Sequence, residues 1–345
     1  MNCFLALASF LTTSLLIEGA LRVNHRHFSS GYVPSENAKI VYELLPGYHL
    51  RSLNAKISSQ GLNDREFSLN KPKGVTRIAV VGDSSSFGWV VGQAAGFPKV
   101  LERRLNTGAD HPFEVLNFSV PGYNTSQESE LIRRKVVSFS PDIVILFFCG
   151  NDVHICNYFQ PEINPWNFLY HRSLFCHWAL RNLSIKINKL DGSNPFEKWL
   201  KRSFLDLKKG VLGMYYPEQE IYSYPGLEET IYLNGNPPAK PELVPLKYRY
   251  MLGYDNYRKH LMDIAGFLKE NKIELISTGF LEPNAKTIHA ELGLPYVDLY
   301  DRILIDGLRY DTMRLFEKEG HLNIEGHEWV AQELHHFLRQ FLSLA

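Results

Sequence analysis

The chain has 345 residues, which is long enough for a large catalytic domain with a full hydrophobic core. Its 37 basic and 37 acidic side chains give a formal net charge of zero, and no strongly basic stripe appears, which argues against a nucleic-acid-binding surface. The four cysteines, at positions 3, 149, 156 and 176, lack the Cys-x-x-Cys spacing of zinc sites, so neither a metal nor an organic cofactor is expected. A disulfide between Cys156 and Cys176 is possible if that part of the chain is exported.

Residues 1–23 predict a membrane signal at the N-terminus. The stretch is apolar up to Ile17, is interrupted by Glu18 and extends to Val23, a length just sufficient for a transmembrane helix. A cleaved signal peptide is the alternative, although the usual basic first region is missing and no clear cleavage site follows. Arg22 and Arg26 favour a cytoplasmic position for the chain that follows the span. Residues 24–73 then form an irregular tether and lead-in.

Three almost continuously apolar runs predict parallel strands that are buried on both faces, at residues 77–81, 113–120 and 142–149. A short polar motif ends each run: Gly-Asp-Ser at 82–84, Pro-Gly at 121–122 and Gly-Asn-Asp at 150–152. All three motifs therefore fall at the carboxyl ends of strands, where open α/β sheets build their sites.

Helical and strand patterns alternate through the rest of the chain. Helices are expected at 97–106, 127–139, 255–271, 285–292 and 325–342, and strands at 273–278 and 296–299. This alternation predicts a parallel sheet with right-handed crossovers.

Residues 153–254 form an insertion that the core fold does not require, with helical patterns at 174–190 and 196–207. We expect a lid or substrate-binding cap, or a basic helix that touches a membrane. Several tyrosines of the insertion could stack on sugar rings or simply form its core: Tyr215, Tyr216, Tyr222, Tyr224 and Tyr232.

The polar motifs have the residue types that ester hydrolysis needs. A serine hydroxyl such as that of Ser84 needs a base to take its proton, and His321 is the candidate. The negative charge that develops on the ester oxygen needs fixed donors, which a glycine N–H at Gly122 and the Asn151 amide could supply. Each motif alone could be an ordinary turn or helix cap, with Asn323 as a cap beside His321. Their occurrence together and in order favours a catalytic site.

Ser84, Gly122, Asn151 and His321, each in its motif, resemble the SGNH hydrolases, also called the GDSL esterase/lipase superfamily, and residues 58–151 resemble its bacterial membrane-anchored members. The resemblance covers residues 40–155 and 255–342. It implies an α/β fold of flavodoxin-like type, a three-layer αβα sandwich with a central parallel sheet. That domain would span residues 74–342, interrupted by the 153–254 insertion.

The resemblance also assigns roles to the site residues. Ser84 would be the nucleophile and His321 the base, and the oxyanion hole would consist of the Ser84 and Gly122 backbone N–H groups and the Asn151 side chain. The family commonly has an aspartate three residues before the histidine, where this chain has Lys318. Either Glu319 is the third member of a triad, or Ser84 and His321 act as a dyad.

The sequence thus predicts a membrane-anchored serine esterase with an extracytoplasmic catalytic domain. Its expected substrate is an acyl ester, most simply an O-acetyl group on an envelope or extracellular glycan, or an acylated lipid. An O-acyltransferase, a lipase or thioesterase, and a non-catalytic glycan-binding protein are the alternatives.

Overall fold

The computed structural model describes residues 2–23, 31–50, 55–161, 163–165, 167–211, 227–229, 242, 244–305, 314–318 and 320–344. The chain divides into two compact units. Unit 1 consists of Met1–Tyr42 and Tyr158–Ile231, and unit 2 consists of Glu43–Asn157 and Tyr232–Ala345.

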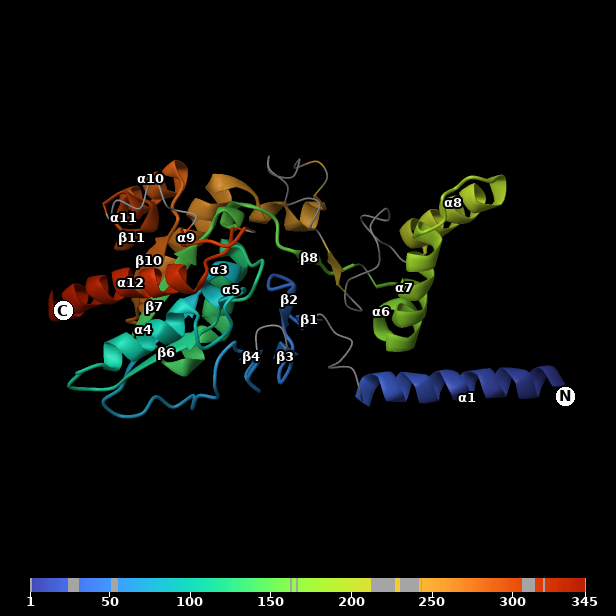
Figure 1. Cartoon of the computed structure of the whole chain (residues 1–345), viewed down its shortest axis with the longest axis horizontal. Coiled ribbons are helices and arrows are strands. Elements are labelled where there is room, and N and C mark those ends of the chain that lie inside the picture. The colour runs from blue at the N-terminus through green and yellow to red at the C-terminus, as the bar shows by residue number, and fades with distance from the viewer. Residues whose placement is uncertain are drawn as a thin grey trace. The chain divides into compact units, whose positions relative to one another are not determined.

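Unit 2 is built on a five-stranded parallel sheet (Figure 1). The order of its strands is β11–β10–β7–β5–β6. The strands are β5 (Thr76–Val81), β6 (Phe113–Asn117), β7 (Ile143–Phe148), β10 (Glu274–Gly279) and β11 (Tyr296–Asp298). Numbered along the chain, this is the 2-1-3-4-5 order of flavodoxin-like sheets, in which the winding reverses between the first and third strands. The predicted α/β fold with a central parallel sheet is therefore confirmed.

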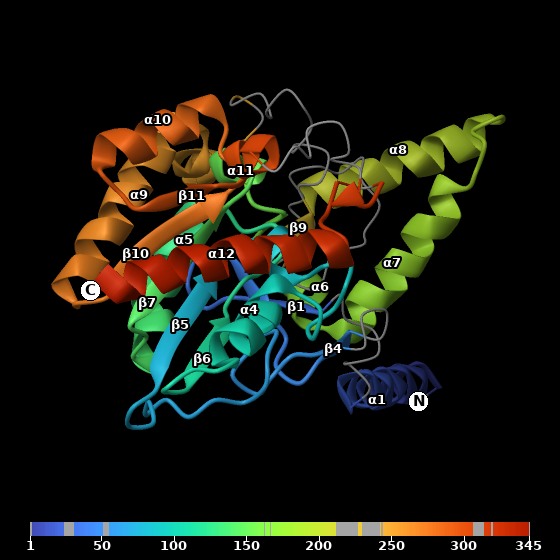
Figure 2. The ribbon, with the colours of Figure 1, turned by 60° about the vertical axis from the view of Figure 1, so that its left-hand side comes forward.

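Helices cover both faces of this sheet. On one face lie α4 (Phe97–Asn106) and α12 (Ile324–Leu344), which share one side of the sheet in Figure 2. On the other lie α5 (Thr125–Arg134) and α9 (Gly253–Glu270), where Phe148 of β7 packs edge-on against Tyr257 at 5.3 Å between ring centroids. Further helical segments in the described part of unit 2 are α3 (Ser84–Phe87), α10 (Pro283–Leu292), α11 (Leu299–Ile305), η2 (Val136–Phe139), η3 (Gly150–Val153) and η6 (Leu246–Met251).

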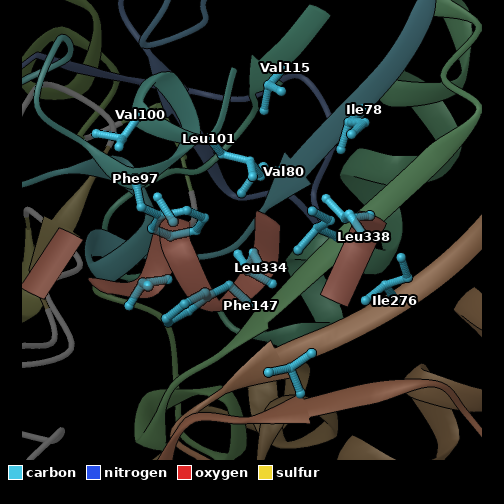
Figure 3. Close-up of a cluster of buried hydrophobic side chains, with 14 of the residues drawn as sticks. Ile78, Val80, Phe97, Val100, Leu101, Val115, Phe147, Ile276, Leu334 and Leu338 are labelled. Atoms are coloured by element: carbon cyan, nitrogen blue, oxygen red, sulfur yellow. The ribbon is translucent and has the colours of Figure 1, made fainter. Parts of the chain in front are cut away.

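The main core lies between the sheet and the α4–α12 layer (Figure 3). Because side chains alternate along a strand, Val80 and Phe147 point to this layer, and Phe97 of α4 meets Phe147 at 5.2 Å between ring centroids. Leu334 and Leu338, one helical turn apart on α12, close the layer with fully buried side chains. This packing holds the carboxyl ends of β5 and β7 in fixed register.

A buried arginine ties together the amino ends of three strands. Arg77 of β5 has no exposed surface, and its guanidinium donates to Glu114 of β6 at 2.6 and 2.9 Å. Its backbone N–H donates to the Asp142 carboxylate, just before β7, at 2.8 Å. A buried cation is stable only when anionic or hydrogen-bonding partners surround it, and Arg77 has such a partner in the Glu114 carboxylate.

Two predicted elements of unit 2 end earlier than expected. Strand β6 stops at Asn117 rather than at 120, although the Phe118 and Val120 N–H groups still donate to the Val80 and Gly82 carbonyls at 2.8 and 3.0 Å. Helix α5 stops at Arg134, and a separate 3-10 turn, η2, covers Val136–Phe139. The tether contains short strands, β1 (Tyr32–Pro34), β2 (Tyr42–Leu44), β3 (His49–Leu50) and β4 (Ala55–Lys56), where irregular structure was expected.

Unit 1 contains the N-terminal helix α1 (Asn2–Val23) and the described part of the insertion. The insertion contributes β8 (Tyr158–Phe159), β9 (Glu228–Glu229) and three helices, α6 (Phe168–Arg172), α7 (Leu174–Asn188) and α8 (Pro195–Gly210). Within the described ranges, one helix is long and apolar enough to cross a membrane, Phe4–Val23, and a signal sequence would meet the same criterion. The limits predicted for the domains stay predictions.

Two other expectations concern the insertion. The side chains of Cys156 and Cys176, both in the described part of the chain, are thiols rather than halves of a disulfide. The five tyrosines considered for sugar stacking, from Tyr215 to Tyr232, lie outside the described residues.

Candidate active site

Ser84 is the first residue of α3, which follows the short connection from the end of β5. The Asp83 carboxylate caps α3 by accepting from the Ser85 N–H at 2.9 Å, and it also accepts from the Ser84 hydroxyl at 3.3 Å. From the lead-in segment, the Asn63 amide donates to the Phe87 carbonyl at 2.7 Å and holds the other end of the helix. Ser84 itself stays partly exposed, so a substrate can reach its hydroxyl.

His321 meets Ser84 although 237 residues separate them. Its Nε2 atom lies 3.0 Å from the Ser84 Oγ atom. The loop that carries His321 is folded back by a hydrogen bond from the Glu317 N–H to the His321 carbonyl at 2.8 Å. Asn323 accepts from the Gly326 N–H at 2.9 Å, so it does cap α12 and thereby fixes the loop at its far end. The pair has the geometry that a serine nucleophile and its base require.

The other ring nitrogen of His321 has no partner in the described part of the chain. Nδ1 is buried and makes no hydrogen bond there. Lys318 lies nearby in sequence but is exposed, and Glu319 lies outside the described residues. The identity of a third catalytic member therefore stays a prediction.

Gly122 and Asn151 follow β6 and β7, the two strands that lie on either side of β5. Gly122 has φ +76°, and a Cβ atom there would overlap the Asn157 side chain, so only glycine fits. Asn151 is the second residue of the η3 turn, and its amide donates to the Tyr123 carbonyl at 3.0 Å. The Asn151 side chain also forms a hydrogen bond with the Asp83 carboxylate. Their roles in an oxyanion hole stay predictions.

Buried carboxyl groups lie behind the turn that carries Asn151. Asp152 accepts from the Thr125 hydroxyl at 2.6 Å and from the Cys149 N–H at 2.7 Å, and its burial raises its pKa to about 7. Glu128 of α5 is fully buried, and burial together with the negative charges of Asp152 and Asp83 raises its pKa well above the usual range. The side chain of Glu128 has no hydrogen-bonding group other than Asp152 beside it among the described residues.

Neither carboxyl group was predicted from the sequence as part of the site. Asp152 was visible as part of the Gly-Asn-Asp motif, since a polar residue at the end of an apolar strand is often buried against the site. Glu128 carries no such signal, because a glutamate in the first turn of an amphipathic helix is ordinarily exposed.

Cys149 and His327 also lie close to the site. The Cys149 sulfur is 3.4 Å from the Ser85 hydroxyl, and burial raises the pKa of this thiol well above its usual range. His327 is buried against α4, where its Nδ1 accepts from the Phe97 N–H at 3.1 Å and burial lowers its pKa to about 4. His327 thus stays neutral and holds α12 to α4, whereas His321 faces the serine.

The strand order, the serine turn and the histidine loop together define an α/β ester hydrolase with a serine–histidine pair at the carboxyl edge of its sheet. The family of GDSL-like lipases and acylhydrolases matches residues 78–334, which is well over half of the chain, and the chain belongs to that family.

Several solved structures are similar to this chain, at low identity. A lipase/acylhydrolase from Enterococcus faecalis is 14% identical, with a TM-score of 0.43 over 77% of this chain and 96% of its own. The esterase EstA from Pseudoalteromonas sp. is 10% identical, with a TM-score of 0.41 over 78% and 99%. An acetyl xylan esterase, AlAXEase, is 14% identical, with a TM-score of 0.40 over 75% and 97%. Comparison with curated protein sequences finds no match.

Proposed function

We propose that this ester hydrolase uses Ser84 as its nucleophile and His321 as its general base, and that it removes a short acyl group, most simply acetyl, from a hydroxyl of an envelope or extracellular glycan. The observation that carries the catalytic part is the 3.0 Å distance between the Ser84 Oγ and His321 Nε2 atoms. The glycan and the acetyl group are the finer part of the proposal and rest on the resemblance of residues 58–151 to bacterial membrane-anchored members of the family.

The reaction would proceed in two balanced halves. Ser84 Oγ attacks the ester carbonyl carbon and its proton passes to His321 Nε2. The Ser84 and Gly122 N–H groups and the Asn151 amide donate to the oxyanion. The bond to the alcohol oxygen then breaks, and that oxygen takes the proton from His321. In the second half, water gives a proton to His321 and attacks the acyl carbon. The bond from that carbon to Ser84 Oγ then breaks and His321 returns the proton to Oγ, which releases the carboxylic acid and restores the Ser84 hydroxyl.

Serine-directed labelling tests the nucleophile. The full chain in detergent micelles should react with a fluorophosphonate probe and hydrolyse p-nitrophenyl acetate. Ser84→Ala should lose both activities, whereas Ser85→Ala, which changes a hydroxyl that faces Cys149, should keep both. Equal labelling of the Ser84→Ala variant would contradict the proposal.

The same assay separates the alternatives. A deacetylase should prefer acetyl over longer p-nitrophenyl esters, whereas a lipase or thioesterase should prefer the longer chains. An acyltransferase should form an acylated sugar faster than free acid when an acceptor sugar is added. A protein that binds glycans without catalysis should neither label nor turn over.

Asn151 provides a second test. Because loss of one oxyanion donor typically costs on the order of 10²–10³ in kcat, Asn151→Ala should lower kcat by about that factor with little change in KM. Asn151 also donates to the Tyr123 carbonyl, so thermal unfolding must be measured beside the kinetics. A folded variant with normal kcat would assign Asn151 to capping alone.

A further inference from the structure

Helix α1 is joined to the insertion through a charged residue inside its apolar span. The Glu18 carboxylate accepts from the Ser173 hydroxyl at 2.9 Å and from the Phe175 N–H at 2.8 Å, at the first turn of α7. Arg22, one turn further along α1, pairs with Glu18 at 2.7 Å and donates to the Arg172 carbonyl at 3.0 Å. An anion at a helix N-terminus is stabilised by the unpaired N–H groups and the helix dipole. Glu18 therefore has a structural partner, and that partner is α7.

The contact fixes the position along α1 of the α6–α7 corner, the point at residues 172–175 where α6 ends and α7 begins. Glu18 is five residues from Val23, the end of the apolar span, which is about 7 Å at 1.5 Å per residue. An apolar cavity of about 510 Å³ continues along α1 from this contact, lined by Leu11 and Leu15 of α1 and by Phe168 and Leu169 of α6. Helices that lie in a membrane interface are buried to a depth of about 5–10 Å, so the corner matches that depth if α1 spans.

Helices α6–α8, called here the helical module, expose large apolar side chains. Phe196 and Trp199 of α8 form an exposed aromatic pair, with 66% and 60% of their surface accessible. Trp178 on α7 and Leu169 on α6 are likewise exposed. Aromatic side chains with a polar edge are enriched where a membrane meets water.

The helical module is also strongly basic. Between Phe168 and Val211 the sequence has nine Lys and Arg residues against three Asp and Glu residues, a formal net charge of +6, whereas the whole chain has a net charge of zero. Basic side chains beside exposed aromatics are typical of helices that bind anionic lipid surfaces.

We propose that the helical module binds the surface of an anionic lipid bilayer beside α1, with the α6–α7 corner among the acyl chains and the basic side chains of α7 and α8 at the level of the head groups. The proposal requires that α1 is retained as a membrane span. A second copy of the chain is a poorer fit, because it would have to bring its own excess of positive charge against this one.

Quenching of tryptophan fluorescence by brominated lipids tests the proposal in the full chain. The protein is reconstituted in phosphatidylcholine–phosphatidylglycerol vesicles whose acyl chains carry bromine. Trp178→Phe/Trp199→Phe should lose most of the quenching seen in the natural protein. The matched control, Trp329→Phe, changes a tryptophan on α12 that packs against the sheet, and it should leave the quenching unchanged.

Three outcomes would overturn the proposal. Release of α1 as a cleaved peptide would remove its premise. Unchanged quenching in Trp178→Phe/Trp199→Phe, with strong quenching of those two residues by aqueous acrylamide, would show that the helical module faces water. Protection of both residues from lipid and from acrylamide would show that protein covers them. None of these outcomes depends on whether Ser84 is catalytic.

Charge-reversal variants test whether the basic side chains of the helical module bind anionic lipid. Lys198→Glu/Arg202→Glu/Lys209→Glu reverses three exposed charges on α8 and should abolish the extra quenching that phosphatidylglycerol gives over pure phosphatidylcholine. The control Lys73→Glu/Lys259→Glu/Lys269→Glu reverses three exposed charges of unit 2 and should keep it. If both variants preferred phosphatidylglycerol over phosphatidylcholine equally, the basic side chains of α8 would have no role in binding the bilayer.

Discussion

The His321 ring is fixed from one side by Ser84, and its other nitrogen is buried without a partner among the described residues. A carboxylate at Nδ1 would hold the tautomer that leaves Nε2 free to accept a proton, and it would stabilise the imidazolium that forms during attack. Glu319 is the predicted source of that carboxylate, and a dyad without it is the alternative.

Replacement of Glu319 by glutamine distinguishes a catalytic triad from a dyad. In a triad, Glu319→Gln should lower kcat by orders of magnitude and move the acidic limb of the pH–rate profile to lower pH, because the charged ring loses its counterion. The measurement is kcat/KM for p-nitrophenyl acetate against pH. Lys318→Ala is the matched control and should change turnover little, since Lys318 is exposed. Normal turnover and an unmoved limb in Glu319→Gln, with inactive His321→Ala, would establish a dyad.

At the level of single residues, the sequence allowed prediction of those groups whose chemistry is visible as a motif. Ser84 and His321 do lie within hydrogen-bonding distance. His321 was the candidate base, and the structure shows how it differs from His327, six residues later: His321 faces Ser84, whereas His327 is buried against Phe97. Burial of Glu128 depends on how α5 packs, which no local pattern records.

At the scale of elements, α5 and the η3 turn are linked through Glu128 and Asp152. Both carboxyl groups have a folded-state pKa above the ordinary value, and that of Asp152 is about 7. The folded state therefore binds more protons than the unfolded state, so the free energy of unfolding falls as pH rises from about 4 through about 7. The stabilisation is complete below the unfolded pKa values and is lost above the folded ones.

Glu128→Gln should reduce this pH dependence. The amide keeps the size of the side chain, offers N–H donors to Asp152 at every pH and removes one negative charge. Each buried proton contributes a slope of up to about 1.4 kcal/mol per pH unit, so the difference between about pH 5 and about pH 8 should shrink measurably. Urea unfolding of the full chain in micelles, followed by tryptophan fluorescence, gives the slope. The exposed Glu270→Gln serves as the control, and an equal slope in all three proteins would exclude the coupled pair.

The elements themselves were largely predictable, because parallel strands buried on both faces leave long apolar runs and amphipathic helices leave a clear stripe. Helix α4 begins and ends at the residues expected. The errors lie at the ends of elements, as at β6, where hydrogen bonds to β5 continue beyond Asn117 although the strand itself has ended. The short strands of the tether were not predicted, because two or three residues are too few to show the alternation of apolar and polar residues that marks a strand.

At the scale of the molecule, the orientation of α1 decides where the catalytic unit works. We expect export, so protease added to spheroplasts should digest the domain that follows Val23. The size of the surviving fragment on a gel is the measurement, and a cytoplasmic protein of the same cells, which must stay intact, is the control. Protection until detergent is added would instead place the domain in the cytoplasm, as Arg22 and Arg26 favour by their charge.

The raised pKa of the Cys149 thiol has a consequence for its reaction with oxidants. Oxidants and alkylating reagents attack the thiolate, and the raised pKa of Cys149 keeps its sulfur protonated although it lies beside the nucleophile turn. Peroxide should therefore react slowly with this sulfur, and covalent probes of the site should report on the serine oxygen rather than on the cysteine sulfur.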